Sequence, residues 1–448
     1  MFEALLNVFR IPDLRKKILF TLLIITVYRI GAHVPTPGID GAALARFFET
    51  IGRQQGGSLF GIMNLFSGGA MAKATIFALG IMPYVSSSII LQLLTVVIPQ
   101  LEQMAKEGEE GRKKIIQYTR YGTVILSLIQ SFFIALWLEH PQAFGGITIV
   151  PHPGWAFRFI AVLTMTTGTA FIMWLGEQID EQGIGNGISI VITAGIIDAL
   201  PGAAGQLFVL VSPFDAAHRQ LALWKLWILL PIAVFVTVAV VMLIQGQRKI
   251  PIQSARRIMG RRIMQAQSSF LPLRVNAAGV IPIIFAQSVV LFPATIAGFV
   301  ANPFLKSVAQ ALSPGHWVYS VIYSFLIVFF AYFYTAITFN PIDIAENLKK
   351  WGSFIPGIRP GQATAEHLDY VMTRIILPGA IALAAVALFP TLISHAMKIP
   401  FLVASFLGGT GLLIIVGVML DTIKALESQL LMRHYDGFIK KGRVKGRR

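Results

Sequence analysis

The chain reads Gly80-Ile81-Met82-Pro83 in one apolar stretch and Gly279-Val280-Ile281-Pro282 in another. Small polar side chains follow both motifs, namely Ser86, Ser87, Ser88 and Gln92 after the first and Gln287 and Ser288 after the second. An interrupted, partly polar span is tolerated in a membrane only where it is buried in protein or lines a cavity. Two such spans at corresponding places in two halves of a chain indicate the path of a substrate.

The apolar stretches around these motifs are typical of a polytopic membrane protein. Of the 448 residues, 55% are hydrophobic and only 13% are charged. A membrane-spanning helix needs about 20 predominantly apolar residues. Ten stretches meet this criterion, at residues 18–36, 74–98, 115–137, 155–176, 184–203, 222–244, 275–299, 317–339, 371–394 and 400–421. Because they are continuous rather than alternating, they predict helices and not a β-barrel, so the expected fold class is all-α.

The distribution of positive charge predicts the orientation in the membrane. The net charge is +16, and 28 of the 37 Lys and Arg residues fall on the side that holds the N-terminus. The positive-inside rule therefore predicts that both termini are cytoplasmic. No small-residue cleavage site follows the amphipathic start, so we expect no removable signal peptide. The chain has no cysteine, which excludes disulfides and thiolate metal sites.

The ten predicted spans divide into two halves of five. Because five is odd, the second half enters the membrane from the opposite side, so any structural repeat is inverted. The expected units are an N-terminal half at 1–200, an external hinge loop at 201–221, a C-terminal half at 222–421 and a basic cytoplasmic tail at 422–448. The C-terminal half contains two long cytoplasmic loops, 245–274 and 340–370.

The sequence argues against nucleotide- or metal-dependent catalysis, so we predict no enzymatic activity, no metal and no cofactor. It contains no Gly-x4-Gly-Lys-Ser/Thr phosphate loop and no His-Glu-x-x-His motif. The glycine-rich stretch at 183–187 superficially matches a dinucleotide fingerprint, but it opens a span and no strand precedes it. Glu177, Asp198 and Asp421 all fall at span ends. Ion-coupled transporters usually carry an ionisable group near mid-membrane, so this distribution disfavours a transporter without excluding one.

Three features allow a functional and a plainer interpretation. The polar residues after the Gly-x-x-Pro motifs either face a wet path or simply hydrogen-bond between packed helices. The external apolar stretch 58–69 is too short to span the membrane, so it is either a movable stopper or a static helix packed on the outer face. The basic residues of the cytoplasmic loops either fix topology or grip phosphates or an acidic partner.

Specific motifs extend over nearly the whole chain. They are Gly80-Ile81-Met82-Pro83-Tyr84-Val85-Ser86, Lys106-Glu107-Gly108 with Arg112, Gln117-Tyr118-Thr119-Arg120-Tyr121-Gly122, Gly183-Ile184-Gly185-Asn186-Gly187-Ile188-Ser189, Asn340-Pro341, and Phe354-Ile355-Pro356-Gly357-Ile358-Arg359-Pro360-Gly361. This set resembles the SecY/Sec61-alpha family of Sec translocon channel subunits. The resemblance implies an hourglass pore between the two halves, through which unfolded secretory chains cross and from which membrane segments leave sideways.

The resemblance also implies roles for individual residues. A ring of branched aliphatic side chains would constrict the pore, at Ile81, Val85, Ile192, Ile284 and Ile414. A re-entrant plug at 58–70 would carry Leu59, Phe60, Ile62, Met63, Leu65 and Phe66. Spans 2 and 7 would form a lateral gate with Pro83, Ser87, Ser88, Gln92, Pro282, Gln287 and Ser288. Docking of a motor or a ribosome would use Arg248, Lys249, Arg256, Arg257, Arg261, Arg262 and Arg359.

The resemblance finally implies the setting in which the chain works. The expected location is the bacterial cytoplasmic (inner) membrane. The expected partners are the SecE and SecG subunits, the SecA motor, the ribosome through its rRNA, signal peptides, nascent chains and membrane lipid. Two other functions stay open at this stage, an ion- or solute-coupled secondary transporter and a membrane scaffold for other subunits. Saturable uptake of a small solute would identify the transporter.

Overall fold

The computed structural model describes most of the chain. The described residues are 11–54, 64, 66–144, 146–211, 223–254, 257–259, 262–264, 268–299, 307–308, 311–313, 316–397, 399, 403–405 and 408–441. Of the expected plug, Leu59, Phe60, Ile62, Met63 and Leu65 lie outside the described residues, as do Arg256 and Arg261 of the expected docking surface.

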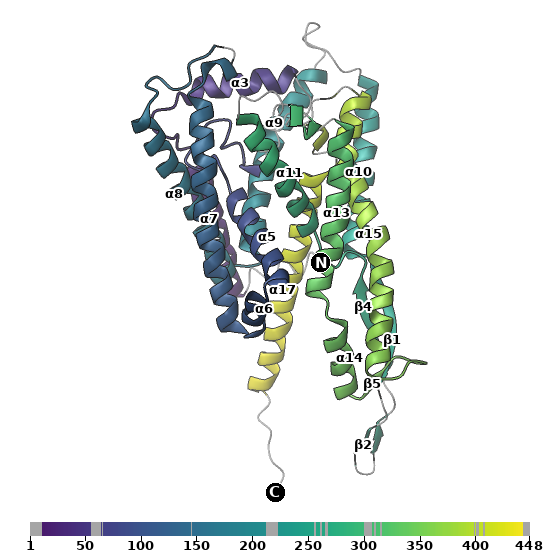
Figure 1. Ribbon diagram of the computed structural model, residues 1–448. Coiled ribbons are helices and arrows are strands. Elements are labelled where there is room, and N and C mark those ends of the chain that lie inside the picture. Colours follow the sequence, from purple (N-terminus) through teal and green to yellow (C-terminus); the bar gives the residue numbers. More distant parts are fainter. Residues whose placement is uncertain are drawn as a thin grey trace.

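Each of the ten predicted spans is occupied by one long helix in the described part of the chain (Figure 1). These helices are α2 (Pro12–Gly31), α5 (Met82–Val97), α7 (Glu109–Leu138), α8 (Trp155–Gln182), α9 (Gly187–Val211), α10 (Leu223–Gln245), α11 (Ile281–Phe299), α13 (Trp317–Thr338), α15 (Gln362–Met397) and α17 (Thr410–Lys441). Shorter helices are α3 (Gly41–Gln54), α6 (Pro99–Lys106), η1 (Pro141–Phe144) and α14 (Pro341–Lys350). Seven helices of the described chain are long and apolar enough to cross a membrane, or eight if the bent pair α5 and α6 is one span. The predicted helical, multi-span membrane fold is confirmed.

The Gly-x-x-Pro motifs begin helices rather than break them. Gly80 and Gly279 both have positive φ angles, +58° and +63°, and α5 and α11 start two residues after them. The prolines lie in the first helical turn, where a missing N–H costs no hydrogen bond. The residues just before both helices are in turns. The predicted spans 74–98 and 275–299 are therefore helical only from 82 and 281, because apolar turns match the composition of a span.

The hinge expected at 201–221 begins as a helix. The helix α9 continues through Pro201 to Val211, and residues 212–222 lie outside the described chain. A proline inside a helix removes one hydrogen bond, and neighbouring helices can compensate in a membrane protein.

The two loops at 245–274 and 340–370, which are expected to be cytoplasmic, contain strands that we did not predict. Strand β1 (Gln247–Ser254) pairs antiparallel with β4 (Ser268–Arg274) and with β5 (Ser353–Phe354), and the short strands β2 (Arg257–Met259) and β3 (Arg262–Met264) form a second pair. Ile250 and Ile252 alternate with exposed residues along β1. That alternation is the sequence pattern of a half-buried strand. The sheet therefore joins the two loops into one unit.

The strands and the helix α3 lie at opposite ends of the molecule (Figure 1). The strands and α14 lie at one end, and α3, which links the first two spans, lies at the other end. This arrangement agrees with the predicted alternation of cytoplasmic and external loops. A large buried apolar cluster lies between these ends and takes residues from helices of both predicted halves.

Candidate functional site

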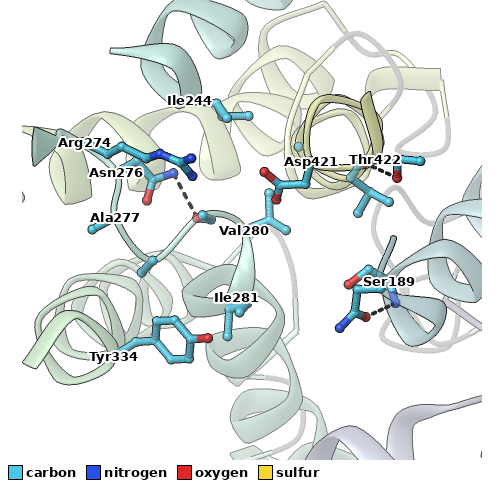
Figure 2. A pocket seen from close by; sticks show the side chains of 15 residues that line it. Ser189, Ile244, Arg274, Asn276, Ala277, Val280, Ile281, Tyr334, Asp421 and Thr422 are labelled. Carbon is cyan, nitrogen blue, oxygen red and sulfur yellow. Dashed lines mark hydrogen bonds between the residues drawn. The ribbon is translucent and has the colours of Figure 1, made fainter. Parts of the chain in front are cut away.

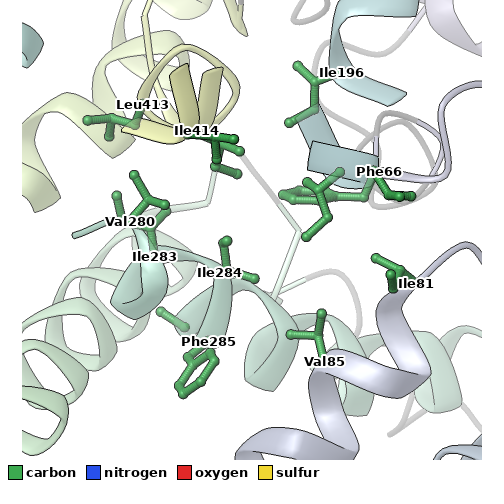
Figure 3. Packing of buried hydrophobic residues seen from close by; sticks show 14 of the residues in the cluster. Phe66, Ile81, Val85, Ile196, Val280, Ile283, Ile284, Phe285, Leu413 and Ile414 are labelled. Atoms are coloured by element: carbon green, nitrogen blue, oxygen red, sulfur yellow. The ribbon is translucent and has the colours of Figure 1, made fainter. Parts of the chain in front are cut away.

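Aliphatic side chains from several helices meet in the middle of the molecule. Ile81, Val85, Ile192, Ile284 and Ile414 all belong to one buried cluster and are each at most 5% exposed. Figure 3 shows those on α5, α11 and α17 pointing toward a common centre. The structure thus brings all five expected ring residues together.

The repeated motif identifies one residue that the sequence reading missed. The carbonyl of Ile81 accepts the N–H of Val85, and the carbonyl of Val280 accepts the N–H of Ile284, at 3.1 and 3.3 Å. Val280 is therefore the counterpart of Ile81, and it is buried in the same cluster (Figure 3). Aligning the two Gly-x-x-Pro motifs would have located it.

Phe66 is the expected plug residue that the structure describes. It is 2% exposed and packs in the same apolar cluster as the aliphatic side chains of α5, α9 and α17 (Figure 3). The turn after it folds back on itself, because the Gly69 N–H donates to the Asn64 carbonyl at 2.9 Å and the Ala72 N–H donates to Asn64 Oδ1 at 2.8 Å. This turn lies between α3 and α5 in the chain.

The polar side chains of the expected gate bond to other helices or within their own helix, not across the seam between α5 and α11. Ser87 donates to the Thr119 carbonyl on α7 at 2.9 Å. Gln287 accepts a long bond from Tyr319 on α13 at 3.5 Å, and its Nε2 is buried without a partner. Ser288 donates to the Ile284 carbonyl of its own helix at 2.9 Å.

The remaining expected gate residues do not bridge the seam either. Gln92 donates to Ser88 within α5 at 3.3 Å, and Pro83 and Pro282 are buried at the helix starts. None of the hydrogen bonds that the polar gate residues make in the described chain joins α5 to α11. The two helices are in contact, and these hydrogen bonds agree with the second of the two interpretations given above, in which the polar residues bond between or within packed helices. The partner of each polar side chain depends on how its helix is rotated against its neighbours, and a single sequence does not reveal that rotation.

The two glycines that start α5 and α11 form a matched pair for mutation. An alanine at either position would keep a positive φ, which costs about 1–2 kcal/mol. At Gly80 an added Cβ would also lie 3.2 Å from the Ser67 Cα, whereas nothing lies within 4 Å at Gly279. We expect both Gly80→Ala and Gly279→Ala to lower the apparent melting temperature in detergent, and Gly80→Ala to lower it more. An equal effect would contradict the tight packing at Gly80.

The expected docking residues occupy the sheet end of the molecule. Arg248 and Lys249 are exposed on β1. Arg257 and Arg262 lie on the paired strands β2 and β3. Arg359 is exposed in the turn between β5 and α15. Because β5 pairs with β1, the structure brings the described basic residues of both loops to one end.

A polar cavity lies on the sheet side of the aliphatic cluster (Figure 2). Its volume is about 250 Å³, and it is lined at the start of α11 by Asn276 and Val280, with Arg274 and Asp421 among its charged residues. The side chain of Asn276 donates to the Gly279 carbonyl at 2.9 Å and so supports the left-handed turn. The cavity thus leads from the sheet side to Val280, which belongs to the aliphatic cluster.

The described residues contain no group of side chains arranged to hold a metal ion.

Comparison with known proteins gives matches along nearly the whole chain. The SecY family model matches residues 75–423. The protein translocase subunit SecY of Escherichia coli K12 is 47% identical, over 97% of this chain and 96% of that protein. The SecY of Aquifex aeolicus is 43% identical, over 98% of this chain and all of that protein.

Solved structures with this fold were also found. A structure of a protein-conducting channel superposes with a TM-score of 0.63 at 17% identity, covering 93% of each chain. A structure concerning the plug domain of SecY, said there to stabilise the closed state of the channel, gives 0.60 at 19% identity, covering 93% of this chain and 92% of that one. Sec61 from a canine ribosome-channel complex gives 0.59 at 16% identity, covering 93% of each chain. These three likenesses concern the fold alone.

Proposed function

Because this chain belongs to the SecY family, we propose that it is a protein-conducting channel that passes unfolded polypeptides across the membrane. The observation that carries this proposal is the convergence of Ile81, Val85, Ile192, Ile284 and Ile414 from both halves of the chain. Apolar walls favour dewetting and thereby oppose ion flow. Branched aliphatic side chains can also move aside for a peptide of any sequence. Val280 is a sixth member of this constriction.

Transport by the purified protein tests the proposal. The chain reconstituted with its partners in liposomes is expected to move an unfolded precursor into the lumen, where added protease cannot reach it. A secondary transporter would instead show saturable uptake of a small solute and no protected precursor. No observation on the described chain favours that alternative, since Glu177 is paired with Arg120 at 2.8 Å and Asp198 with Arg29.

The lateral gate is the seam between α5 and α11. The helices touch through apolar side chains such as Val85 and Ile284, and their polar side chains are held by neighbouring helices. Parting the two helices therefore breaks apolar contacts that lipid tails or an apolar signal peptide can replace. No hydrogen bond between the described gate residues opposes this movement.

The plug is the external segment 58–70, which seals the constriction from the outer side. Phe66 supports this role because its ring is buried beside the aliphatic side chains of the constriction. The fold likeness to a SecY structure that concerns a plug domain gives further support.

The cytoplasmic sheet and the turn at Arg359 form the docking surface for the ribosome and the SecA motor. Exposed basic residues attract the phosphates of rRNA and acidic protein surfaces over long distances. The likeness to Sec61 in a ribosome-channel complex supports the first of these partners. Energy for transport would come from the partners, since the sequence has no phosphate loop.

An apolar groove supports binding of the SecE subunit. Its cavity volume is about 590 Å³, and it runs between α2, α9 and α17. The residues Leu22, Ile190, Ala194 and Val418 line it. These helices belong to both halves of the chain, so a transmembrane helix of SecE in this groove would clamp the halves together. SecG would bind at the periphery.

Filling the groove is expected to weaken SecE binding. Ala194→Trp adds a large ring to the groove wall, and overpacking a contact typically costs about 1–3 kcal/mol. We expect the variant to retain SecE several-fold less well in affinity purification from detergent. Leu163→Trp is the matched control, since Leu163 is exposed on α8 and does not line the groove. Equal SecE retention by Ala194→Trp and the native chain would contradict the proposed site.

The proposed location is the bacterial cytoplasmic membrane, with both termini in the cytoplasm. Exposed tryptophans support the membrane boundary on one side, because Trp155, Trp227 and Trp317 lie near the starts of α8, α10 and α13. These helices are the fourth, sixth and eighth spans, so all three rings mark the same face of the membrane. Tryptophan favours the membrane–water interface.

A further inference from the structure

An ion pair joins two helices beside the turn that ends the proposed plug. Arg29 of α2 pairs with Asp198 of α9 through Nη2 and Oδ1. The other terminal nitrogen of the same guanidinium, Nη1, donates to the Gly68 carbonyl at 3.4 Å. The neighbouring Tyr28 hydroxyl donates to the Ser67 carbonyl at 3.5 Å. Three parts of the chain, α2, α9 and the turn after Phe66, thus meet at one charged group.

The turn is rigid enough to transmit this attachment to Phe66. The Ser67 hydroxyl donates to the Asn64 carbonyl and accepts the Met71 N–H, both at 3.1 Å. Asn64 also accepts hydrogen bonds from the Gly69 and Ala72 N–H groups. Together these contacts close the turn on itself. Holding the Ser67 and Gly68 carbonyls therefore also holds Phe66 in the apolar cluster.

The turn lies directly against α9. Gly68 has a φ of +63°, and a Cβ added there would lie 2.9 Å from the Gly195 Cα. A Cβ added at Gly69 would come within 3.9 Å of Asp198 Oδ2. The close backbone contact brings the Gly68 carbonyl within reach of Arg29, whose partner Asp198 lies one helical turn along α9 from Gly195.

A partly buried ion pair near the ends of two predicted spans calls for an explanation. The Arg29 and Asp198 side chains are only 23% and 39% exposed, although both lie in helices that cross the membrane. Ionisable groups in such helices are costly and often functional. Apolar residues such as Ile25 and Ile197 line the groove beside the pair, so the charges stand in an otherwise apolar stretch of α2 and α9.

We infer that Arg29 and Asp198 are positioning residues that hold the plug closed. This inference rests on the proposed plug function of segment 58–70. Asp198 orients the guanidinium, and the guanidinium holds the Gly68 carbonyl, so that Phe66 stays in the constriction. Opening the channel requires the Gly68 contact to break while the ion pair remains between α2 and α9.

Asp198→Asn tests the inference, because it removes the charge without changing the size of the side chain. A single thiol placed by Ala70→Cys reports the plug, since the native chain has no cysteine and Ala70 is fully buried. In the complex reconstituted in liposomes, we expect Asp198→Asn to raise labelling of this thiol by a water-soluble maleimide about fivefold, as for loss of one partly exposed ion pair. Ion conductance is expected to rise together with the labelling. Arg29→Gln should raise both, whereas Arg29→Lys, which keeps the positive charge, should stay close to the native chain.

Two controls separate the possible outcomes. Glu139→Gln removes the other ion pair near the external face, with Arg158 at 2.7 Å, and should leave labelling and conductance unchanged. Deletion of 58–65 should raise conductance on its own. If the deletion opens the channel and Asp198→Asn changes neither readout, the inference about Arg29 and Asp198 is wrong and the plug stands. If the deletion leaves conductance unchanged, the plug itself is wrong. A lower melting temperature for Asp198→Asn with unchanged labelling would assign the pair to helix packing and overturn the inference.

Discussion

Arg359→Glu is expected to stop motor-driven export while the protein stays in the membrane. The turn that carries Arg359 is fixed at both ends. The Ile358 N–H donates to the Ile355 carbonyl at 3.1 Å, and the Thr364 hydroxyl donates to the Arg359 carbonyl at 2.8 Å. Ile355 is buried in the apolar cluster beneath the cytoplasmic sheet. The guanidinium is therefore presented on a rigid support, and reversing its charge opposes an acidic or phosphate partner directly.

The size of this effect follows from like-charge contact. Such a contact costs about 3 kcal/mol, or more than about a hundredfold in binding. The measurement is export of a precursor by membranes that contain equal amounts of each variant. Lys349→Glu on the last turn of α14 is the matched control, since it reverses an exposed charge on a neighbouring element. Export at the native rate by Arg359→Glu would remove Arg359 from the docking surface.

Ile284→Asn is expected to make the constriction leak ions. Ile284 is 5% exposed in the cluster where α5, α11 and α17 converge. An amide in this position holds water that an aliphatic wall excludes. Hydrating one such group changes the free energy by about 1–3 kcal/mol, so conductance should rise by about tenfold or more. The measurement is single-channel current in planar bilayers.

Two further variants distinguish a leak from general damage. Ile284→Leu keeps the apolar wall and should keep the seal. Ile172→Asn introduces the same amide at a fully buried position of the same cluster on α8, where it should lower stability without forming a conducting path. Deleting residues 58–65 in both the native chain and the Ile284→Asn variant separates the contribution of the ring to the seal from that of the plug. Equal currents for Ile284→Asn and Ile284→Leu would contradict the proposed ring.

The helical spans could be predicted because a membrane requires long apolar helices. Their starts were less certain, since the turns before Met82 and Ile281 are as apolar as the helices they precede. The strands of the cytoplasmic loops were missed although Ile250 and Ile252 alternate with exposed residues on β1. The Gly-x-x-Pro pair predicted a repeated local structure correctly, but as two helix starts instead of two breaks.

Contacts between distant parts of the chain could not be predicted in this way. Arg29 and Asp198 are separated by most of the N-terminal half, and only the packing of α2 against α9 brings them together. The sequence left two interpretations of Ser87 and Gln287 open, a wet path and hydrogen bonds between packed helices, and in the structure they bond to α7 and α13. The direction in which a polar residue of a membrane helix points depends on its neighbours, and periodicity within one helix does not reveal them.

Photocrosslinking of a signal peptide to the chain tests the central claim most directly. A photoreactive residue in the apolar core of a precursor's signal peptide would be activated while the precursor is arrested in the channel. We expect adducts on both α5 and α11, on residues near Val85 and Ile284. Adducts confined to α8, with none on α5 or α11, would contradict the account.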